Sequence, residues 1–161
     1  MRANAARTIG SLKDKAGRDR LLALLKDASP RVRSLAAIAL SRVTQTGDTA
    51  ATDALYQMAE QTGSKPLDPV LRPACLGALD HVGSVEAAVK RSDAESDEVR
   101  LTALLYLRRH EHAEVARFLK DKSPLIRREA VRAIYDTKAV DGSAGKALAK
   151  LASTVSDLPQ T

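Results

Sequence analysis

Three histidines, one cysteine and a few grouped carboxylates are the residues of this chain with the most obvious capacity for chemistry. The densest group is His110-Glu111-His112, which would begin a metal site if more ligands joined it. Two residues apart on a helix, however, the two imidazole rings point in different directions. No Cys, Asp or Glu cluster at ligand spacing accompanies them. We therefore interpret His110 and His112 as polar residues at a corner between helices.

Nucleophilic and acid–base chemistry find equally little support. Cys75 is the only cysteine, so neither a disulfide within the chain nor a thiolate metal cage can form. The carboxylates of Glu95, Asp97 and Glu98 lie in or beside an expected turn, where helix capping explains them. No nucleophile elbow, phosphate-binding glycine loop or dinucleotide fingerprint occurs. The sequence therefore predicts no catalytic residue, no metal and no cofactor.

Arginine carries a clearer pattern, because it recurs with the same neighbours along the chain. Five copies of the pattern align on Arg2, Arg33, Arg72, Arg100 and Arg127, at intervals of 31, 39, 28 and 27 residues. A small residue follows each arginine by three positions and a large aliphatic residue follows it by seven. The small residues are Ala5, Ala36, Cys75, Ala103 and Ala130, so we interpret Cys75 as a packed thiol. These offsets share one face of a helix, and such a period is typical of a solenoid.

Capping residues and apolar spacing predict where the helices lie. The expected helices are 2–12, 17–26, 30–43, 48–61, 68–82, 84–90, 97–109, 113–120, 125–135 and 143–153. Short connections make neighbours in sequence neighbours in space, and no two-residue alternation indicates a sheet. Asp68 would cap its helix, which places Pro73 five positions inside it, where a proline removes a backbone donor and bends the chain.

Two of the copies resemble the HEAT repeat most closely. The matching residues are Asp27, Pro30 and Arg33, and again Asp121, Pro124 and Arg127. The resemblance implies an all-α fold, a right-handed α-solenoid of about five HEAT-like helical hairpins. It also implies a hydrogen-bonded ladder in which a turn aspartate meets an arginine of the second helix. By resemblance the ladder residues are Asp27, Arg33, Arg72, Arg100, Asp121 and Arg127.

A narrower resemblance covers residues 68–151. The segments 99–109, 115–121 and 128–136 are similar to the HEAT segment of PVC-type haem-binding proteins, which are often labelled membrane-bound dehydrogenases. The resemblance implies an oxidoreductase parent, and it alone suggests an exported or periplasmic location. The haem motif of such parents needs two cysteines, which this chain lacks. We expect a single HEAT-repeat domain over 1–155, cut from a longer protein, and a disordered tail over 156–161.

Charge is unevenly distributed along the chain. Residues 1–45 carry 10 Lys+Arg against 3 Asp+Glu, residues 46–98 carry 4 against 10, and residues 99–161 carry 12 against 7. The net charges are therefore +7, −6 and +5, which suggests basic surfaces at two places. Second helices line the concave side of HEAT solenoids, so the resemblance implies that Arg108, Arg128 and Arg132 form a ridge for an acidic partner. The alternative is a solvated helix face.

These observations favour a non-catalytic scaffold that presents a surface to another protein or to a neighbouring domain of its parent. The alternative is a nucleic-acid-binding HEAT-like module with a basic concave face. The acidic middle segment and the absence of Trp disfavour nucleic acid. A third hypothesis is a metal-dependent enzyme, for which only His110-Glu111 matches the His-Glu pairs of HEAT-like hydroxylases. No apolar run approaches 18 residues, so we expect no membrane insertion by this segment.

Overall fold

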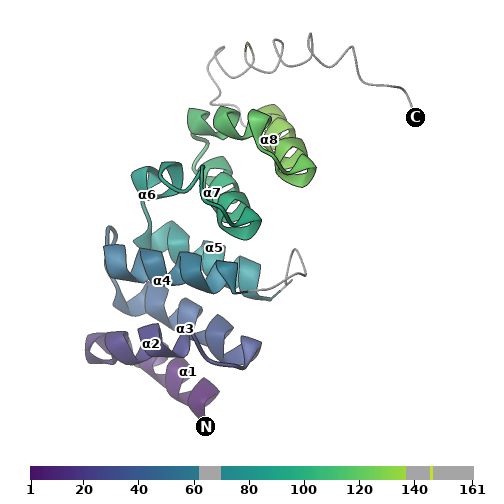
Figure 1. Ribbon diagram of the computed structural model, residues 1–161. Coiled ribbons are helices and arrows are strands. Elements are labelled where there is room, and N and C mark those ends of the chain that lie inside the picture. The colour runs from purple at the N-terminus through teal and green to yellow at the C-terminus, as the bar shows by residue number, and fades with distance from the viewer. Residues whose placement is uncertain (62–69, 137–145, 147–161) are drawn as a thin grey trace. The chain divides into compact units, whose positions relative to one another are not determined.

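A computed structural model of the chain describes residues 1–61, 70–136 and 146. Every regular element in these ranges is helical (Figure 1). The elements are α1 (Arg2–Leu12), η1 (Lys15–Gly17), α2 (Arg18–Leu24), α3 (Pro30–Val43), α4 (Thr49–Glu60), α5 (Leu71–Val82), α6 (Val85–Val89), α7 (Asp97–Arg109), η2 (Ala113–Lys120) and α8 (Pro124–Asp136), where η marks a 3₁₀ helix. The predicted all-α class, built from HEAT-like helical hairpins, is confirmed, and the handedness of the solenoid stays a prediction.

The chain forms two compact units, Met1–Lys90 and Arg91–Thr161. In the first unit α3 lies between α1 and α5, while α2 packs on α3 and α4 packs on α5. In the second unit α7, η2 and α8 pack on one another. Each unit therefore repeats the same plan, in which a first helix supports a second helix. The expected single domain over 1–155 stays a prediction.

The repeated core positions are filled largely as the pattern predicts. Ala36, Ala103 and Ala130 are fully buried, as are the aliphatic residues Leu40 and Leu107. Close-packed small residues let neighbouring helices approach, and the aliphatic residues fill the space between layers. These repeated positions are therefore filled by small and aliphatic residues, and the buried aromatic side chains Tyr56, Tyr106 and Phe118 lie outside the pattern.

The first copy departs from this pattern. Ala5 and Ile9 are only half-buried, whereas Ala6 and Gly10 are buried. A Cβ on Gly10 would lie 2.8 Å from the Cα of Ala39 in α3, which shows how closely the two helices approach at this point. Ala5 and Ile9, the small and the aliphatic residue of this copy, therefore lie beside the closest contact between α1 and α3 rather than within it.

Several helix boundaries differ from those predicted. The helix expected over 17–26 covers only Arg18–Leu24, and the one over 113–120 is a 3₁₀ helix. Because α5 begins at Leu71, Pro73 is its third residue. A proline there removes a backbone N–H that has no acceptor within the helix, so the predicted bend has no basis.

Some predicted features fall outside the part of the chain that the structure describes. They are the loop 62–67, the cap Asp68, the tail 156–161 and the last helix 143–153, of which only Lys146 is described.

Candidate functional site

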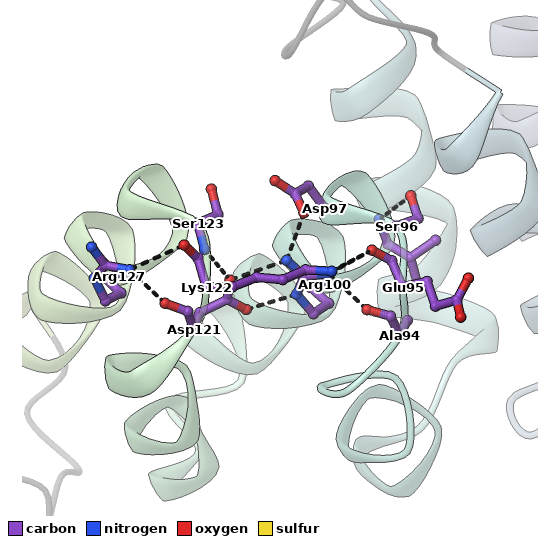
Figure 2. A network of polar contacts seen from close by, with 10 residues as sticks. Ala94, Glu95, Ser96, Asp97, Arg100, Asp121, Lys122, Ser123 and Arg127 are labelled. Carbon is purple, nitrogen blue, oxygen red and sulfur yellow. Dashed lines mark hydrogen bonds and ion pairs between the residues drawn. The ribbon is translucent and has the colours of Figure 1, made fainter.

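The most buried polar cluster surrounds Arg100, in the second unit (Figure 2). Its Nε donates to Oδ2 of Asp121 at 2.7 Å, and its Nη2 donates to Oδ1 of the same carboxylate at 3.1 Å. Nη1 donates to the carbonyl oxygens of Ala94 and Glu95 at 2.7 and 2.8 Å. Nη2 also donates to Oδ1 of Asp97 at 2.6 Å. One guanidinium thus joins the turn before α7 to the turn before α8.

Burial and pairing act in opposite directions on this pair. Burial raises the pKa of Asp121. Hydrogen bonds from Arg100 and from the backbone N–H of Ser123 lower the pKa by more than burial raises it, so it lies below its ordinary value. The hydrogen bond to Asp121 in turn raises the pKa of Arg100. Both side chains are therefore charged, although only 3% and 4% of their surfaces are exposed.

Asp121 also organises its own turn. Its Oδ1 accepts from the backbone N–H of Ser123 at 2.7 Å. Nη1 of Arg127 donates to the carbonyl oxygen of Asp121 at 2.7 Å and to that of Lys122 at 3.2 Å. The arginine of one copy thus binds the aspartate side chain of the next, while that next copy's arginine binds the backbone of the same turn.

The first unit repeats this arrangement around Asp27. Nε of Arg2 donates to Oδ2 of Asp27 at 2.5 Å, the backbone N–H of Ser29 donates to Oδ1 at 2.9 Å, and Nη1 of Arg33 donates to the carbonyl oxygen of Asp27 at 2.8 Å. The hydrogen bonds from Ser29 and then Arg2 lower the pKa of Asp27. We call the Arg2, Asp27 and Arg33 set and the Arg100, Asp121 and Arg127 set the two ladder turns.

Arg72 was predicted to continue the ladder. It lies half-buried in α5, and the aspartate of its copy, Asp68, is outside the described residues. Its role stays a prediction.

A further ion pair in the first unit was missed by sequence reasoning. Nε and Nη2 of Arg18 donate to the two carboxylate oxygens of Asp48, each at 2.7 Å, and Oδ1 of Asp48 also accepts from the backbone N–H of Ala51 to cap α4. The hydrogen bond from Arg18 lowers the pKa of Asp48. The two residues are about one repeat apart, which is the only signal that the sequence offers.

The predicted arginine ridge is partly neutralised by acids of its own unit. Arg108 pairs with Asp136 and, at 3.7 Å, with Glu129. Arg132 pairs with Glu129 at 3.1 Å, whereas Arg128 is exposed. Two of the three arginines therefore present less positive charge than their spacing indicates, and the proposed acidic-partner role of the ridge stays a prediction.

His110, His112 and Cys75 take structural positions. The ring of His110 lies 4.3 Å from that of Tyr106, and Nδ1 of His112 accepts from the backbone N–H of Glu114 at the start of η2. Within the described ranges no group of three or more His, Cys, Asp or Glu residues is placed to hold a metal. Cys75 is buried, as predicted, and burial raises the pKa of its thiol to about 12. That pKa makes it a poor nucleophile at neutral pH.

A groove runs between α3 and α5 in the first unit. Just after α3, Oγ1 of Thr46 donates to the carbonyl oxygen of His81 at 2.9 Å, and the backbone N–H of Gly47 donates to that of Val82 at 3.0 Å. Because both acceptors lie at the end of α5, the two helices end on the same side and run in the same direction. Both are second helices of their copies.

This α3–α5 groove has a volume of about 480 Å³. Its lining includes Ser34, Ile38, Ser41 and Arg42 from α3, and Val70, Pro73, Ala74, Gly77, Ala78 and His81 from α5 and the residue before it. Ile38 and Val70 are 41% and 54% exposed, so the groove offers apolar surface to water. Arg42 and His81 stand at the end where both helices finish, and no carboxylate is among these lining residues. The groove thus combines an apolar body with one basic end.

Comparison with known protein families identifies a match in the first half of the chain. The structure defines an α-helical repeat protein, and a family model described as HEAT repeats matches residues 1–79. The match supports the HEAT-repeat family and spans α1 to α4 and most of α5, which includes nearly all of the α3–α5 groove. No curated protein matches the chain. HEAT repeats typically serve as protein-interaction scaffolds and are typically non-enzymatic.

The narrower resemblance to haem-binding dehydrogenases gains no support from these comparisons. In the part of the chain that the structure describes, no helix is both long enough and apolar enough to cross a membrane.

Proposed function

We propose that this chain is a non-catalytic scaffold that binds another protein, or a neighbouring domain of a parent chain, through the α3–α5 groove. The observation that carries the proposal is the groove itself, with the exposed side chains of Ile38 and Val70 along it. Apolar surface gathered in a groove with a polar end is typical of a binding site rather than of a solvated helix face.

Polar contacts behind the groove support this proposal. The Asp27 turn precedes α3, and its aspartate and backbone are bound by Arg2 and Arg33. Arg18 ties the start of α2 to the cap of α4, and these two helices pack on α3 and α5. We propose that the ladder turns and the Arg18–Asp48 pair hold the second helices in place. A site on rigid elements loses less conformational entropy when a partner binds.

Site-specific photo-crosslinking in cells tests this function. A benzophenone amino acid replaces Ile38 in the groove or, as the matched control, Gln57 on the exposed side of α4. We expect the groove position to give discrete crosslinked products, each containing this chain joined to one partner protein. We expect the control position to give none of these products. Identical products from both positions, or none from Ile38, would contradict the proposal.

Nucleic-acid binding is the alternative function. Arg42 and His81 at one end of the groove favour a phosphate, but the lining residues include no Phe, Tyr or Trp to stack on a base. Titration of labelled duplex DNA across a salt series decides the matter. A steep loss of affinity with salt, removed by a change of Arg42, would favour nucleic acid.

The oxidoreductase parent and the exported location stay predictions that rest on the narrower resemblance over residues 68–151. The sequence of the full-length gene tests them directly. A dehydrogenase region and a Cys-x-x-Cys-His module in the same reading frame would support the prediction, and a gene without them would overturn it.

A further inference from the structure

We propose that the α3–α5 groove exists because Gly77 has no side chain, and that it binds an acidic peptide segment whose main chain passes over this glycine. The proposal rests on the proposed function and adds the class of segment that is recognised. Four observations carry it, and they concern Gly77, its equivalents in the other copies, Ser34 and the charges at the end of the groove.

Gly77 is not explained by the fold. It is the seventh of the twelve residues of α5, and a glycine inside a helix costs up to about 1 kcal/mol relative to alanine. A Cβ built at this position would meet no atom within 4 Å. Gly10 differs, because a Cβ there would lie 2.8 Å from both the Cα and the Cβ of Ala39. Packing therefore requires Gly10 but leaves Gly77 without a structural reason.

The other copies show what this position usually holds. Gly77 follows the aligned Arg72 by five positions. The residues at the same offset in the other copies are Arg7, Ile38, Leu105 and Arg132. All four have long or branched side chains, so α5 alone among the five copies leaves this part of its surface bare. The missing side chain accounts for the open space between α3 and α5.

Ser34 adds a polar group to the wall of the groove. It lines the groove from α3, and only 7% of the residue is exposed. No hydrogen bond joins its hydroxyl to another residue of the described ranges, and its oxygen is not among the fully buried atoms without a partner, so it is open to the groove. A backbone N–H or carbonyl of a segment lying in the groove would provide that partner. Main-chain recognition of this kind also needs the close approach that a glycine allows.

Charge selects an acidic segment. The charged or titratable side chains that line the groove are Arg42 and His81, at the same end, with no carboxylate among the lining residues. Arg42 is exposed and forms no ion pair with any residue that the structure describes. The other charged residues of α3 are Arg31 and Arg33, so that helix carries no negative charge. A carboxylate of the bound segment would therefore lie against Arg42.

The size of the groove limits the length of the segment. Its lining on the α5 side runs from Val70 to His81, which corresponds to roughly 16 Å of helix. An extended chain rises about 3.3 Å per residue, so about five residues fit along it. An apolar side chain of the segment would pack between Ile38 and Val70, and an Asp or Glu would occupy the other end.

Selection from a displayed library of random nine-residue peptides tests the proposal. The full chain is the target, and the selected peptides are then synthesised and titrated by fluorescence anisotropy. We expect selected peptides rich in Asp or Glu, with an apolar residue four or five positions away. Selection of neutral or basic peptides would overturn the acidic class.

Two variants and two matched controls locate the binding site. Gly77→Leu places a leucine side chain in the groove and Arg42→Glu reverses the charge at its end, so each should weaken the binding of the selected peptides by at least about tenfold. Gln57→Leu introduces the same leucine and Arg20→Glu the same charge reversal on exposed residues outside the lining, and both should leave affinity unchanged. Circular dichroism melts check folding, and we expect Gly77→Leu to be as stable as the parent or more so. Unchanged affinity in a folded Gly77→Leu variant would overturn the proposal.

Photo-crosslinking and peptide selection together distinguish the scaffold function from the binding of an acidic segment. Crosslinks from position 38 together with non-acidic selected peptides would leave the scaffold function standing and remove the acidic segment. The absence of both crosslinks and selected peptides would remove both. Duplex DNA that binds the chain and is released by Arg42→Glu would replace the peptide with nucleic acid.

Discussion

The two ladder turns make the same hydrogen bonds in very different surroundings. In the first unit, Arg2 binds Asp27 with 66% of the arginine side chain but only 7% of the aspartate side chain exposed to water. In the second unit, Arg100 binds Asp121 with only 3% exposed. An exposed ion pair contributes little to stability, whereas breaking a buried pair leaves an uncompensated charge. One sequence motif therefore specifies the same connections twice, and burial decides how much each set matters.

The largest expected effect follows from this difference. Arg100→Ala should destabilise the second unit by about 3–5 kcal/mol, because Asp121 would stay buried without its partner. Arg2→Ala should have a much smaller effect on the first unit, since water replaces its guanidinium. Native-state hydrogen exchange of amides in α7 and α3 measures the two units separately. Equal losses in the two variants would show that burial is not the deciding factor.

The two glycines sharpen the comparison within the first unit. Gly10→Ala should destabilise the chain by about 1–3 kcal/mol, because its Cβ would collide with the backbone of Ala39. Gly77→Ala should stabilise it by up to about 1 kcal/mol, because the added methyl group meets no atom and favours the helix. Urea unfolding of both variants measures these opposite signs. A destabilised Gly77→Ala variant would mean that packing does require this glycine.

The dependence of the free energy of unfolding on pH in acid should distinguish Asp121 from an ordinary surface carboxylate. Its pKa is lowered in the folded state, so its charged form adds stability above the unfolded pKa near 4. That stability is lost as the pH falls from about 4 through the lower folded pKa. Asp121→Asn should therefore flatten the rise of unfolding free energy with pH below about pH 5. The exposed Asp93→Asn is the control, and a similar flattening in both variants would contradict the assignment.

The smallest expected effect concerns salt. Double-mutant cycles on Arg2 with Asp27 should give a coupling that disappears at 1 M NaCl, where the screening length is about 3 Å. The coupling of Arg100 with Asp121 should persist, because salt reaches a buried pair poorly. If the coupling of Arg2 with Asp27 persisted at high salt, the difference in exposure between the two pairs would not explain their energetics.

Local patterns explain why much of the fold was predictable. The turn before α3 and the turn before α8 carry Asp, Pro and Arg at the same offsets, so their hydrogen bonds follow from short-range geometry. Helix limits followed from apolar spacing and from residues such as Pro30, which begins α3 as expected. The helix predicted over 68–82 is seen as α5 from Leu71 onward, and its predicted cap, Asp68, lies outside the described residues.

Contacts between copies explain why the rest was not predictable. Arg108 looked like an unpartnered cation because its acids, Glu129 and Asp136, lie one repeat further along the chain. The α3–α5 groove depends on a side chain that is absent, and no motif in the sequence singles out Gly77. The role of Gly77 can be inferred only from the structure, which shows that a Cβ added there would meet no atom within 4 Å.

The most direct test of the groove compares stability and binding in a single variant. Gly77→Leu should melt at or above the temperature of the parent chain while its affinity for the selected acidic peptides falls by at least about tenfold. A variant that folds and still binds those peptides with the parent's affinity would show that the α3–α5 groove is not where this chain meets its partner.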